Sequence, residues 1–224
     1  FTILGFGLFG KTPTNILPIM FGVFLSAKLV GKRFNEYILI ALFGTALGPL
    51  VTMLAFEVVA TPWAGVPLAV AGGVAAGMLL PPLALAMLRL HQGYNLYNIG
   101  LTAGFLGLLA AAVVSARAGP LDLGSRWNAA PSLVLLLAMP VLSILLVATG
   151  LAMGARGAWT GFNKILRLSG RLPSDFMDTA GVPAGLLNMG LMGIASWVYV
   201  LAVGGPHNGP VLGGILTVVG FAAF

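Results

Sequence analysis

The amino-acid sequence predicts an all-α protein, a polytopic transmembrane bundle of about seven or eight spans. Hydrophobic residues make up 59% of the 224 residues and charged residues only 7%, whereas about a quarter of a soluble domain is charged. The few charges are separated by uncharged stretches long enough for a helix to cross the hydrocarbon layer. Glycine and proline, with 32 and 14 copies, are frequent in membrane helices that pack closely or are broken.

This composition excludes a soluble enzyme, a disordered chain and a nucleic-acid-binding domain. The net charge is +6, but the basic residues are few and lie between apolar stretches, so they form no footprint for nucleic acid. Cysteine is absent, which removes disulfide and thiolate chemistry. HExxH and GxSxG motifs and clusters of Asp or His are also missing. We therefore expect neither an enzyme, nor a metal site, nor a cofactor.

Seven segments are apolar enough to be predicted as spans, since a crossing helix needs about 20 apolar residues. They are 14–31, 37–57, 67–89, 98–116, 131–153, 183–203 and 210–224. Residues 1–9 have the composition of the end of one more span. The sequence begins without Met and stops inside an apolar run, so we expect it to be part of a longer chain. We expect residues 1–224 to form a single integral membrane domain with broken or re-entrant helices.

The cations predict the orientation, because cytoplasmic loops carry an excess of Lys and Arg. Threading the seven spans puts eight cations on one side of the membrane and three on the other. The eight are Lys28, Lys32, Arg33, Arg89, Arg156, Lys164, Arg167 and Arg171; the three are Lys11, Arg117 and Arg126. The first side is therefore predicted to be cytoplasmic, in a multi-pass protein of the inner (cytoplasmic) membrane.

Residues 154–181 are predicted to form a basic cytoplasmic loop. On a helical wheel the four cations of this loop share one face, and Trp159, Phe162, Ile165 and Leu166 share the opposite face. This pattern is typical of an interfacial helix on anionic lipid. Gly157, Gly161 and Gly170 weaken the helix prediction, and a loop that only sets the orientation fits equally well.

The two ends of the sequence resemble each other. FTILGFGLF (1–9) aligns with LTVVGFAAF (216–224), and Thr2, Gly5, Phe6 and Phe9 match Thr217, Gly220, Phe221 and Phe224. By the span list the two copies run in opposite directions. Inverted repeats are a recurring plan of transporters, and we expect one here. A second, local likeness relates NIGL (98–101) to NMGL (188–191).

The stretch HQGYNLYNIGLTAGFLG (91–107) gathers polar residues where the chain enters the membrane. Burying such groups is costly unless they are hydrogen-bonded, and polar groups inside membranes mostly face the bundle interior or a watered path. We therefore predict a substrate pathway lined by Tyr94, Asn95, Tyr97, Asn98 and Thr102. The alternative is that the asparagines tie helices together and the tyrosines form the interfacial belt.

Three other residues are candidates for the same pathway, and a fourth is a candidate for an ion or proton site. Asn188 lies in a run that is otherwise nearly free of polar groups, and Thr14 and Asn15 follow Pro13 at a plausible start of a broken helix. Capping alone explains Thr14 equally well. Glu57 is a candidate ion or proton site if it is deep, but the nearby Thr61-Pro62-Trp63 also allows it to reach water.

Three strings resemble a bacterial family of polytopic membrane proteins that is classed only as a domain of unknown function. They are FTILGFGLFGKTPTNILPIMFGVFLSAK, LFGTALGPLV and GYNLYNIGLTAGFLG. This resemblance covers essentially the whole chain and implies a duplicated architecture. A fainter resemblance, carried by GYNLYNIG (93–100) and loosely by PTN (13–15), is to urea transporters, which implies inverted repeats around a narrow pore. The order of residues differs, and no Asn-Pro pair occurs.

These observations predict a channel or secondary transporter for a small polar solute or ion. The scarcity of buried charge favours a neutral solute, or an ion held by dipoles. The alternative is a non-transporting membrane scaffold or partner subunit, with a dry interior and fully bonded asparagines. An intramembrane enzyme is disfavoured by the missing catalytic groups. The expected partners are the lipid bilayer and the solute, and a homo-oligomer is compatible with the sequence.

Overall fold

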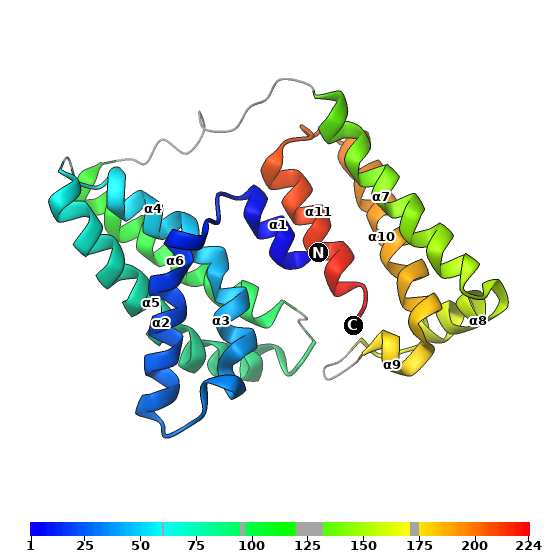
Figure 1. The fold of residues 1–224 in the computed structure, drawn as a ribbon, viewed down its shortest axis with the longest axis horizontal. Coiled ribbons are helices and arrows are strands. Elements are labelled where there is room, and N and C mark those ends of the chain that lie inside the picture. Colours follow the sequence, from blue (N-terminus) through cyan, green and yellow to red (C-terminus); the bar gives the residue numbers. More distant parts are fainter. Residues whose placement is uncertain (60, 95–96, 120–131, 171–174) are drawn as a thin grey trace. The chain divides into compact units, whose positions relative to one another are not determined.

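The computed structural model describes residues 1–59, 61–94, 97–119, 132–170 and 175–224. Every regular element in these ranges is a helix and none is a strand, which confirms the all-α fold class. The chain divides into two compact units (Figure 1). The continuous unit comprises residues 9–124, and the discontinuous unit comprises residues 1–8 together with 125–224. Each unit has its own apolar core, and the single domain over residues 1–224 stays a prediction.

Five helical segments have the length and composition to cross a membrane. They are Phe34–Phe56, Pro62–His91, Asn98–Arg117, Leu133–Ala152 and Val182–Ala202. Two more apolar helices, Pro13–Leu29 and Gly209–Phe221, are shorter. Helices therefore occupy all seven predicted spans, and the long ones indicate a multi-pass membrane protein in contact with lipid. The total number of spans and the choice of the inner membrane stay predictions.

The continuous unit is built around the long helix α5. Its elements are α2 (Pro13–Leu29), η1 (Phe34–Tyr37), α3 (Ile38–Gly44), η2 (Thr45–Leu47), α4 (Gly48–Phe56), α5 (Pro62–His91) and α6 (Asn98–Ala118). Helices α2 and α5 run parallel and touch through glycine. A Cβ at Gly22 would overlap the backbone of Val74, and one at Gly77 would overlap the backbone of Ile19. Such contacts bring helix backbones together in the way small residues permit in membranes.

Helix α4 runs antiparallel to α5 and contacts the start of α2. The start of α5 at Gly65 lies against Ala55 near the end of α4, and the start of α2 at Asn15 lies against Gly48 at the start of α4. Helix α6 packs on α5 and α3. The start of α2 and the start of α4 are thus brought side by side.

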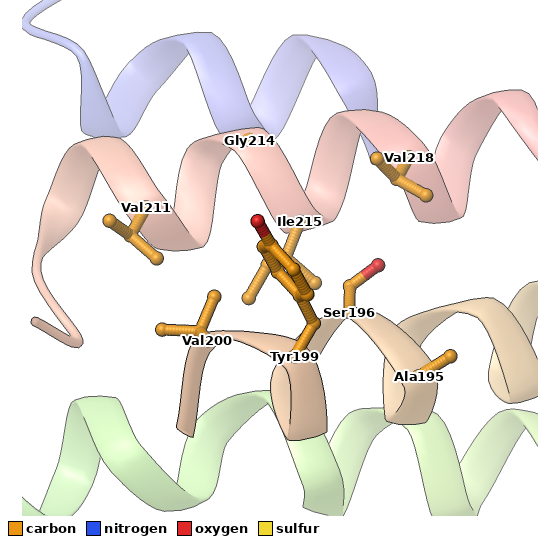
Figure 2. Close-up of a pocket in the computed structure, with 8 residues that line it drawn as sticks. All are labelled: Ala195, Ser196, Tyr199, Val200, Val211, Gly214, Ile215 and Val218. Carbon is orange, nitrogen blue, oxygen red and sulfur yellow. The ribbon is translucent and has the colours of Figure 1, made fainter. Parts of the chain in front are cut away.

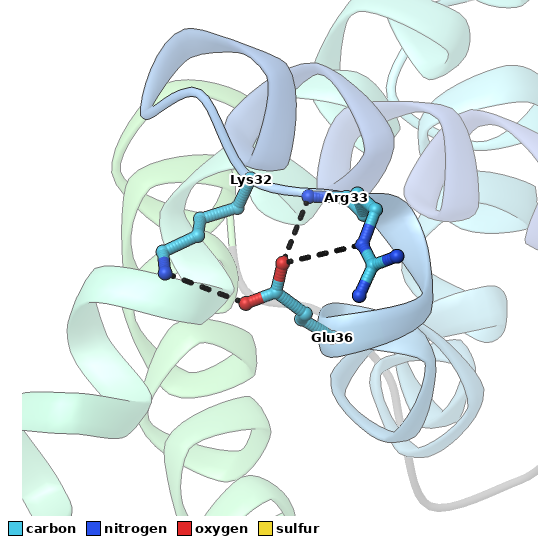
Figure 3. Close-up of polar contacts among 3 residues, drawn as sticks. All are labelled: Lys32, Arg33 and Glu36. Carbon is cyan, nitrogen blue, oxygen red and sulfur yellow. Dashed lines mark hydrogen bonds and ion pairs between the residues drawn. The ribbon is translucent and has the colours of Figure 1, made fainter.

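The turn between α2 and η1 is held by Glu36 (Figure 3). The backbone N–H of Arg33 donates to Glu36 Oε1 over 3.1 Å, and Lys32 Nζ lies 3.5 Å from Glu36 Oε2. These side chains are exposed, so the ion pairs add little stability. Glu36 therefore acts mainly on the backbone of this turn.

The predicted span 37–57 is helical but not one continuous α-helix. Helix α3 ends at Gly44, a single 3-10 turn follows over Thr45–Leu47, and α4 begins at Gly48. Thr45 is fully buried, and its hydroxyl donates to the carbonyl oxygen of Leu42 over 2.5 Å. The interruption therefore lies inside the unit, where irregular backbone is tolerated at membrane depth.

The discontinuous unit contains α1 (Thr2–Leu8), α7 (Leu133–Ala152), α8 (Ala155–Ile165), α9 (Phe176–Ala180), α10 (Val182–Ala202) and α11 (Gly209–Phe221). Helices α7 and α10 are antiparallel. A Cβ at Gly150 would lie 2.7 Å from the carbonyl oxygen of Pro183, and one at Gly190 would lie 2.6 Å from that of Ser143. Near the other end of the pair, Trp197 Nε1 donates to the carbonyl oxygen of Leu136 over 2.9 Å.

Helices α1 and α11 form a second antiparallel pair, visible in blue and red in Figure 1. A Cβ at Gly5 would lie 3.3 Å from Cβ of Leu216, and one at Gly220 would lie 3.3 Å from Cβ of Phe1. In the alignment of the two chain ends, Gly5 matches Gly220 and Phe1 matches Leu216. The contact between Gly5 and Leu216 and the contact between Gly220 and Phe1 are therefore equivalent when the two similar segments are exchanged.

The basic loop contains a helix, α8, over Ala155–Ile165, and its place at the membrane interface stays a prediction. Ile165, on the apolar face of the helical wheel, is buried together with Ala158 and Gly161. Gly161 packs against Ala184 of α10, where a Cβ would lie 2.5 Å away from Cβ of Ala184. The glycine that weakened the helix prediction is thus the residue that lets α8 approach α10. Arg171 lies outside the described residues.

Candidate functional site

Asn15 holds the start of α2 by four hydrogen bonds. Its Oδ1 accepts from the backbone N–H of Thr12 over 2.8 Å, and its own N–H donates to the Thr12 hydroxyl over 3.2 Å. Its Nδ2 donates to the carbonyl oxygen of Gly10 and to Thr52 Oγ1 of α4, each over 2.9 Å. This reciprocal arrangement with Thr12 is a capping box. The N-cap is therefore Thr12, whereas Thr14 is exposed and contacts the Thr12 hydroxyl.

The contact between Asn15 and α4 lies next to the interrupted span. A Cβ at Gly48 would lie 2.6 Å from Asn15 Oδ1, so only glycine leaves room for the amide there. Asn15 is 5% exposed and Thr45 is fully buried. We define the broken-helix site as Asn15, Thr45, Gly48 and Thr52.

The starts of α2 and α4 meet at the broken-helix site. Few backbone N–H groups are open there, because Pro13 and Pro49 have none. The N–H of Asn15 donates to the Thr12 hydroxyl, and the N–H of Gly48 donates to the carbonyl oxygen of Thr45. The nearest charged neighbour in sequence is Lys11, and partial burial lowers the pKa of its ammonium group below the ordinary value. The polar groups of the site are therefore the Asn15 amide and the hydroxyls of Thr45 and Thr52.

Sequence reasoning identified Asn15 but missed Thr45 and Thr52. A usable signal was present, since two glycines bracket Thr45 in the string Gly44-Thr-Ala-Leu-Gly48 inside an apolar span. That spacing also indicates a close contact between helices. In the structure the first glycine packs on Leu80, and the second makes room for Asn15.

The predicted pathway residues around position 98 lie at the junction of α5 and α6. Asn98 Nδ2 donates to the carbonyl oxygen of Ala84 over 3.1 Å, and Asn98 Oδ1 lies 2.9 Å from His91 Nε2. His91 Nδ1 accepts from the backbone N–H of Gly93 over 3.3 Å. The neutral tautomer with its proton on Nε2 therefore fits, and that N–H donates to Asn98.

The other residues of this group differ in exposure. Thr102 is 1% exposed, and its hydroxyl donates within the helix to the carbonyl oxygen of Asn98 over 2.7 Å. Tyr94 is 63% exposed. Tyr97 is half-buried, and this burial raises the pKa of its phenol above the ordinary value, so it keeps its proton at neutral pH. Asn95 lies outside the described residues.

Asn15 and Asn98 do not converge on one point. Pro18, one turn after Asn15, packs on Gly73 of α5, whereas Asn98 binds Ala84 of the same helix. Gly73 and Ala84 are separated by about 16 Å along the helix axis at 1.5 Å per residue. The structure thus gives two separate polar positions in the continuous unit.

Asn188 lies in the discontinuous unit, buried in α10. Its Nδ2 donates over 2.7 Å to the carbonyl oxygen of Ala222, just after the end of α11. This bond satisfies one of the carbonyl groups that a helix end leaves without a partner. Asn98 and Asn188, the two asparagines of the local sequence likeness, thus each donate from Nδ2 to a backbone carbonyl, which lies inside α5 for Asn98 and after α11 for Asn188.

Ser143 is a polar residue that the sequence did not single out. It is 0% exposed in α7, and its hydroxyl has no hydrogen-bond partner among the described residues. It packs against Gly193 of α10, where a Cβ would also lie 3.0 Å from Val219. A buried hydroxyl without a partner lowers stability.

We expect Ser143→Ala to leave the free energy of unfolding unchanged or to raise it by about 1 kcal/mol. Gly193→Ala should lower it, because the new methyl meets the Ser143 hydroxyl. The double variant should recover part of that loss. Thermal unfolding of all four proteins in detergent measures this coupling, and strictly additive effects would contradict the packing.

Glu57 is the remaining candidate for an ion or proton site. Glu57 is the exposed C-cap residue of α4, a position that suits the interfacial interpretation. Within the described ranges, no three residues among His, Cys, Asp and Glu come together as a metal site. A role of Glu57 for an ion or a proton stays a prediction.

An apolar groove of about 500 Å³ lies between α10 and α11 (Figure 2). Tyr199 and Val200 line it from α10, and Val211, Ile215 and Val218 line it from α11. Ser196 adds a hydroxyl, but none of the predicted pathway residues takes part. The groove therefore belongs to the apolar surface of the discontinuous unit and not to the broken-helix site.

Comparison with known proteins gives a family and no established activity. The family model described as "Protein of unknown function (DUF1576)" matches residues 1–116 and 155–224. No curated protein and no solved structure matches the chain. The matched ranges contain every residue of the broken-helix site, together with Asn98 and Asn188. The chain thus belongs to the DUF1576 family, whose function is unknown.

Proposed function

We propose that this protein is a channel or secondary transporter for a small polar solute or ion. The observation that carries the proposal is the interrupted membrane helix at Thr45–Leu47, which lies next to the buried amide of Asn15. Transporters commonly bind their cargo where broken helices leave polar backbone at membrane depth. A 3-10 stretch inside a helix often marks a functional hinge.

The chemistry of the site narrows the cargo. The starts of α2 and α4 meet there, but Pro13 and Pro49 have no N–H group, so side chains must supply the hydrogen bonds to a solute. The nearby side chains are an amide and two hydroxyls rather than carboxylates. A neutral solute with a carbonyl group, or an anion held by dipoles, fits this environment better than a cation.

The pair of α1 and α11 supports an inverted repeat. The two helices are similar in sequence and antiparallel, and the contacts Gly5–Leu216 and Phe1–Gly220 are equivalent under the repeat. A two-fold axis through this pair accounts for both facts. A pore between inverted repeats, as in urea transporters, is one form of the proposal.

The alternative function is a non-transporting scaffold or partner subunit, and one observation favours it. Both Nδ2 hydrogens of Asn15 are used within the protein, and Asn98 and Asn188 each bind a backbone carbonyl. In a scaffold these bonds persist and the interior stays dry. In a transporter the Asn15–Thr52 bond opens when a solute takes its place. The two functions therefore predict different behaviour of Thr52. In a scaffold Thr52 keeps its hydrogen bond to Asn15, and in a transporter it exchanges that bond for one to the solute.

Thr52→Val tests the proposal, because it removes one hydroxyl at nearly constant shape. We expect solute entry into proteoliposomes to fall about tenfold, since one good hydrogen bond at a binding site is worth about 1.4 kcal/mol. Stopped-flow light scattering across small neutral solutes, with anion flux measured separately, gives the readout. Thr149→Val is the matched control, because that hydroxyl is exposed and binds only Leu145 within α7.

Three results bear on this test. A selective flux that Thr52→Val lowers and Thr149→Val leaves unchanged supports transport through the broken-helix site. A flux equal in both variants places the path elsewhere. No flux of any solute or ion by the unmodified protein removes the transport proposal and leaves the scaffold.

Asn98→Ala is expected to lower flux as well if the path continues to the junction of α5 and α6. The variant would release His91 Nε2 and the carbonyl of Ala84 from their present bonds. The melting temperature must be measured together with the flux. Unchanged flux in a well-folded Asn98→Ala protein would take Asn98 out of the pathway.

A further inference from the structure

Helix α8 lies at the level where two membrane-length helices leave the hydrocarbon layer. It begins three residues after the end of α7, beyond a sharp bend at Gly154, and it packs on the first turn of α10 through Gly161. The α7–α8 corner is visible in Figure 1. Because α7 ends and α10 begins here, the position of α8 is the membrane–water interface.

The surface of α8 that does not face α10 has an apolar part. Trp159 is 48% exposed and Leu166 is 66% exposed. Phe162 lies between them in the same stripe, and its ring packs edge-on against that of Trp159 with centroids 6.0 Å apart. Exposed aromatic side chains of this kind sit at the headgroup level of a bilayer.

A polar pocket of about 390 Å³ lies next to this stripe on α8. Thr160, Asn163, Lys164 and Arg167 line it. Lys164 Nζ donates to the carbonyl oxygen of Thr179 over 2.6 Å, which fixes the ammonium group and leaves two of its three N–H groups. In the part of the chain that the structure describes, the ion pairs within 4 Å at Lys32 and Arg33 both use Glu36, and no carboxylate is paired with Lys164 or Arg167.

We propose that this pocket binds the phosphate headgroup of an anionic phospholipid. Two cations, an amide and a hydroxyl supply the donors that phosphate oxygens require. Trp159 and Leu166 lie beside the pocket and would contact the upper part of the acyl chains. That combination distinguishes a lipid from free phosphate, which gains nothing from the apolar stripe. The site is independent of the broken-helix site and of whether the protein transports a solute.

The test compares lipid binding by the full chain in neutral detergent, measured by native mass spectrometry. The probes are phosphatidylglycerol, phosphatidylcholine and inorganic phosphate at one ionic strength. Lys164→Gln/Arg167→Gln should weaken phosphatidylglycerol binding about tenfold or more, since each cation near an anionic headgroup contributes about one kcal/mol. Phosphatidylcholine binding should change little. The single variant Arg167→Gln leaves the Lys164–Thr179 bond in place and should give part of the effect.

The matched control is Lys28→Gln/Arg89→Gln, which removes the same charge from exposed positions near the ends of α2 and α5. It should change phosphatidylglycerol binding less than about twofold. An equal loss of phosphatidylglycerol binding in both double variants would show that binding depends only on the overall charge of the protein. Unchanged binding in Lys164→Gln/Arg167→Gln, or equal competition by inorganic phosphate, would also overturn the proposal.

Discussion

Gly77→Ala is expected to lower the free energy of unfolding by about 3 kcal/mol or more. The added methyl would enter the backbone of α2 at Ile19, and Gly22 lies on the opposite side of the same contact. Neither partner is a flexible side chain, so α2 and α5 would have to separate. Their contact is part of the core of the continuous unit, which includes Ile19, Val23 and Leu80. Thermal unfolding in detergent should show a large fall in Tm.

The control is Gly104→Ala in α6, where a Cβ would meet no atom within 4 Å. Alanine is the better helix former by about 1 kcal/mol, so this variant should be as stable as the unmodified protein or slightly more so. A similar loss in both variants would show that glycine matters for its flexibility and not for the close contact.

Asn15→Ala should have the second-largest effect, a loss of about 2–4 kcal/mol. The change leaves the carbonyl of Gly10, the N–H of Thr12 and the hydroxyl of Thr52 without their partner. These groups belong to a site that is almost closed to solvent, since Asn15 is 5% exposed. Asn15→Asp should also destabilise, because it replaces the NH₂ group, with its two donor hydrogens, by one acceptor oxygen.

Asn35→Ala is the control for Asn15→Ala, because Asn35 is exposed in η1. It should change stability by less than about 0.5 kcal/mol. Chemical denaturation in mixed micelles, followed by far-UV circular dichroism, compares the two. If Asn15→Ala were as stable as Asn35→Ala, the capping box would not hold α2 in place.

The positions of the helices were predictable because charge and proline mark the ends of membrane spans. The predicted span 183–203 became α10 over Val182–Ala202, and the span 98–116 became α6 over Asn98–Ala118. The position of the interruption in the span 37–57 was not predicted, although Pro49 lies two residues after the 3-10 turn and cannot donate a backbone hydrogen bond. The contact of Gly48 with Asn15 was not predictable, because these residues are far apart in the sequence and meet only in the fold.

The hydrogen-bond partners of the polar residues also could not be predicted from the sequence. Asn15, Asn98 and Asn188 are unusual in their apolar surroundings. The sequence therefore indicated only that burying these side chains without hydrogen bonds would cost free energy. Hydrogen-bond partners depend on tertiary contacts, such as Thr52 for Asn15 and Ala222 for Asn188. In α8, the wheel separated polar from apolar residues but could not show that Ile165 faces α10 while Trp159 stays exposed.

The pairing of α1 with α11 sets an order for biosynthesis. Helix α11 leaves the ribosome about 200 residues after α1, roughly 10–40 s later at 5–20 residues per second. The continuous unit can fold during that interval, because its elements are adjacent in sequence. The contact between α1 and α11 forms only after α11 has been made, so the discontinuous unit is completed after the continuous unit.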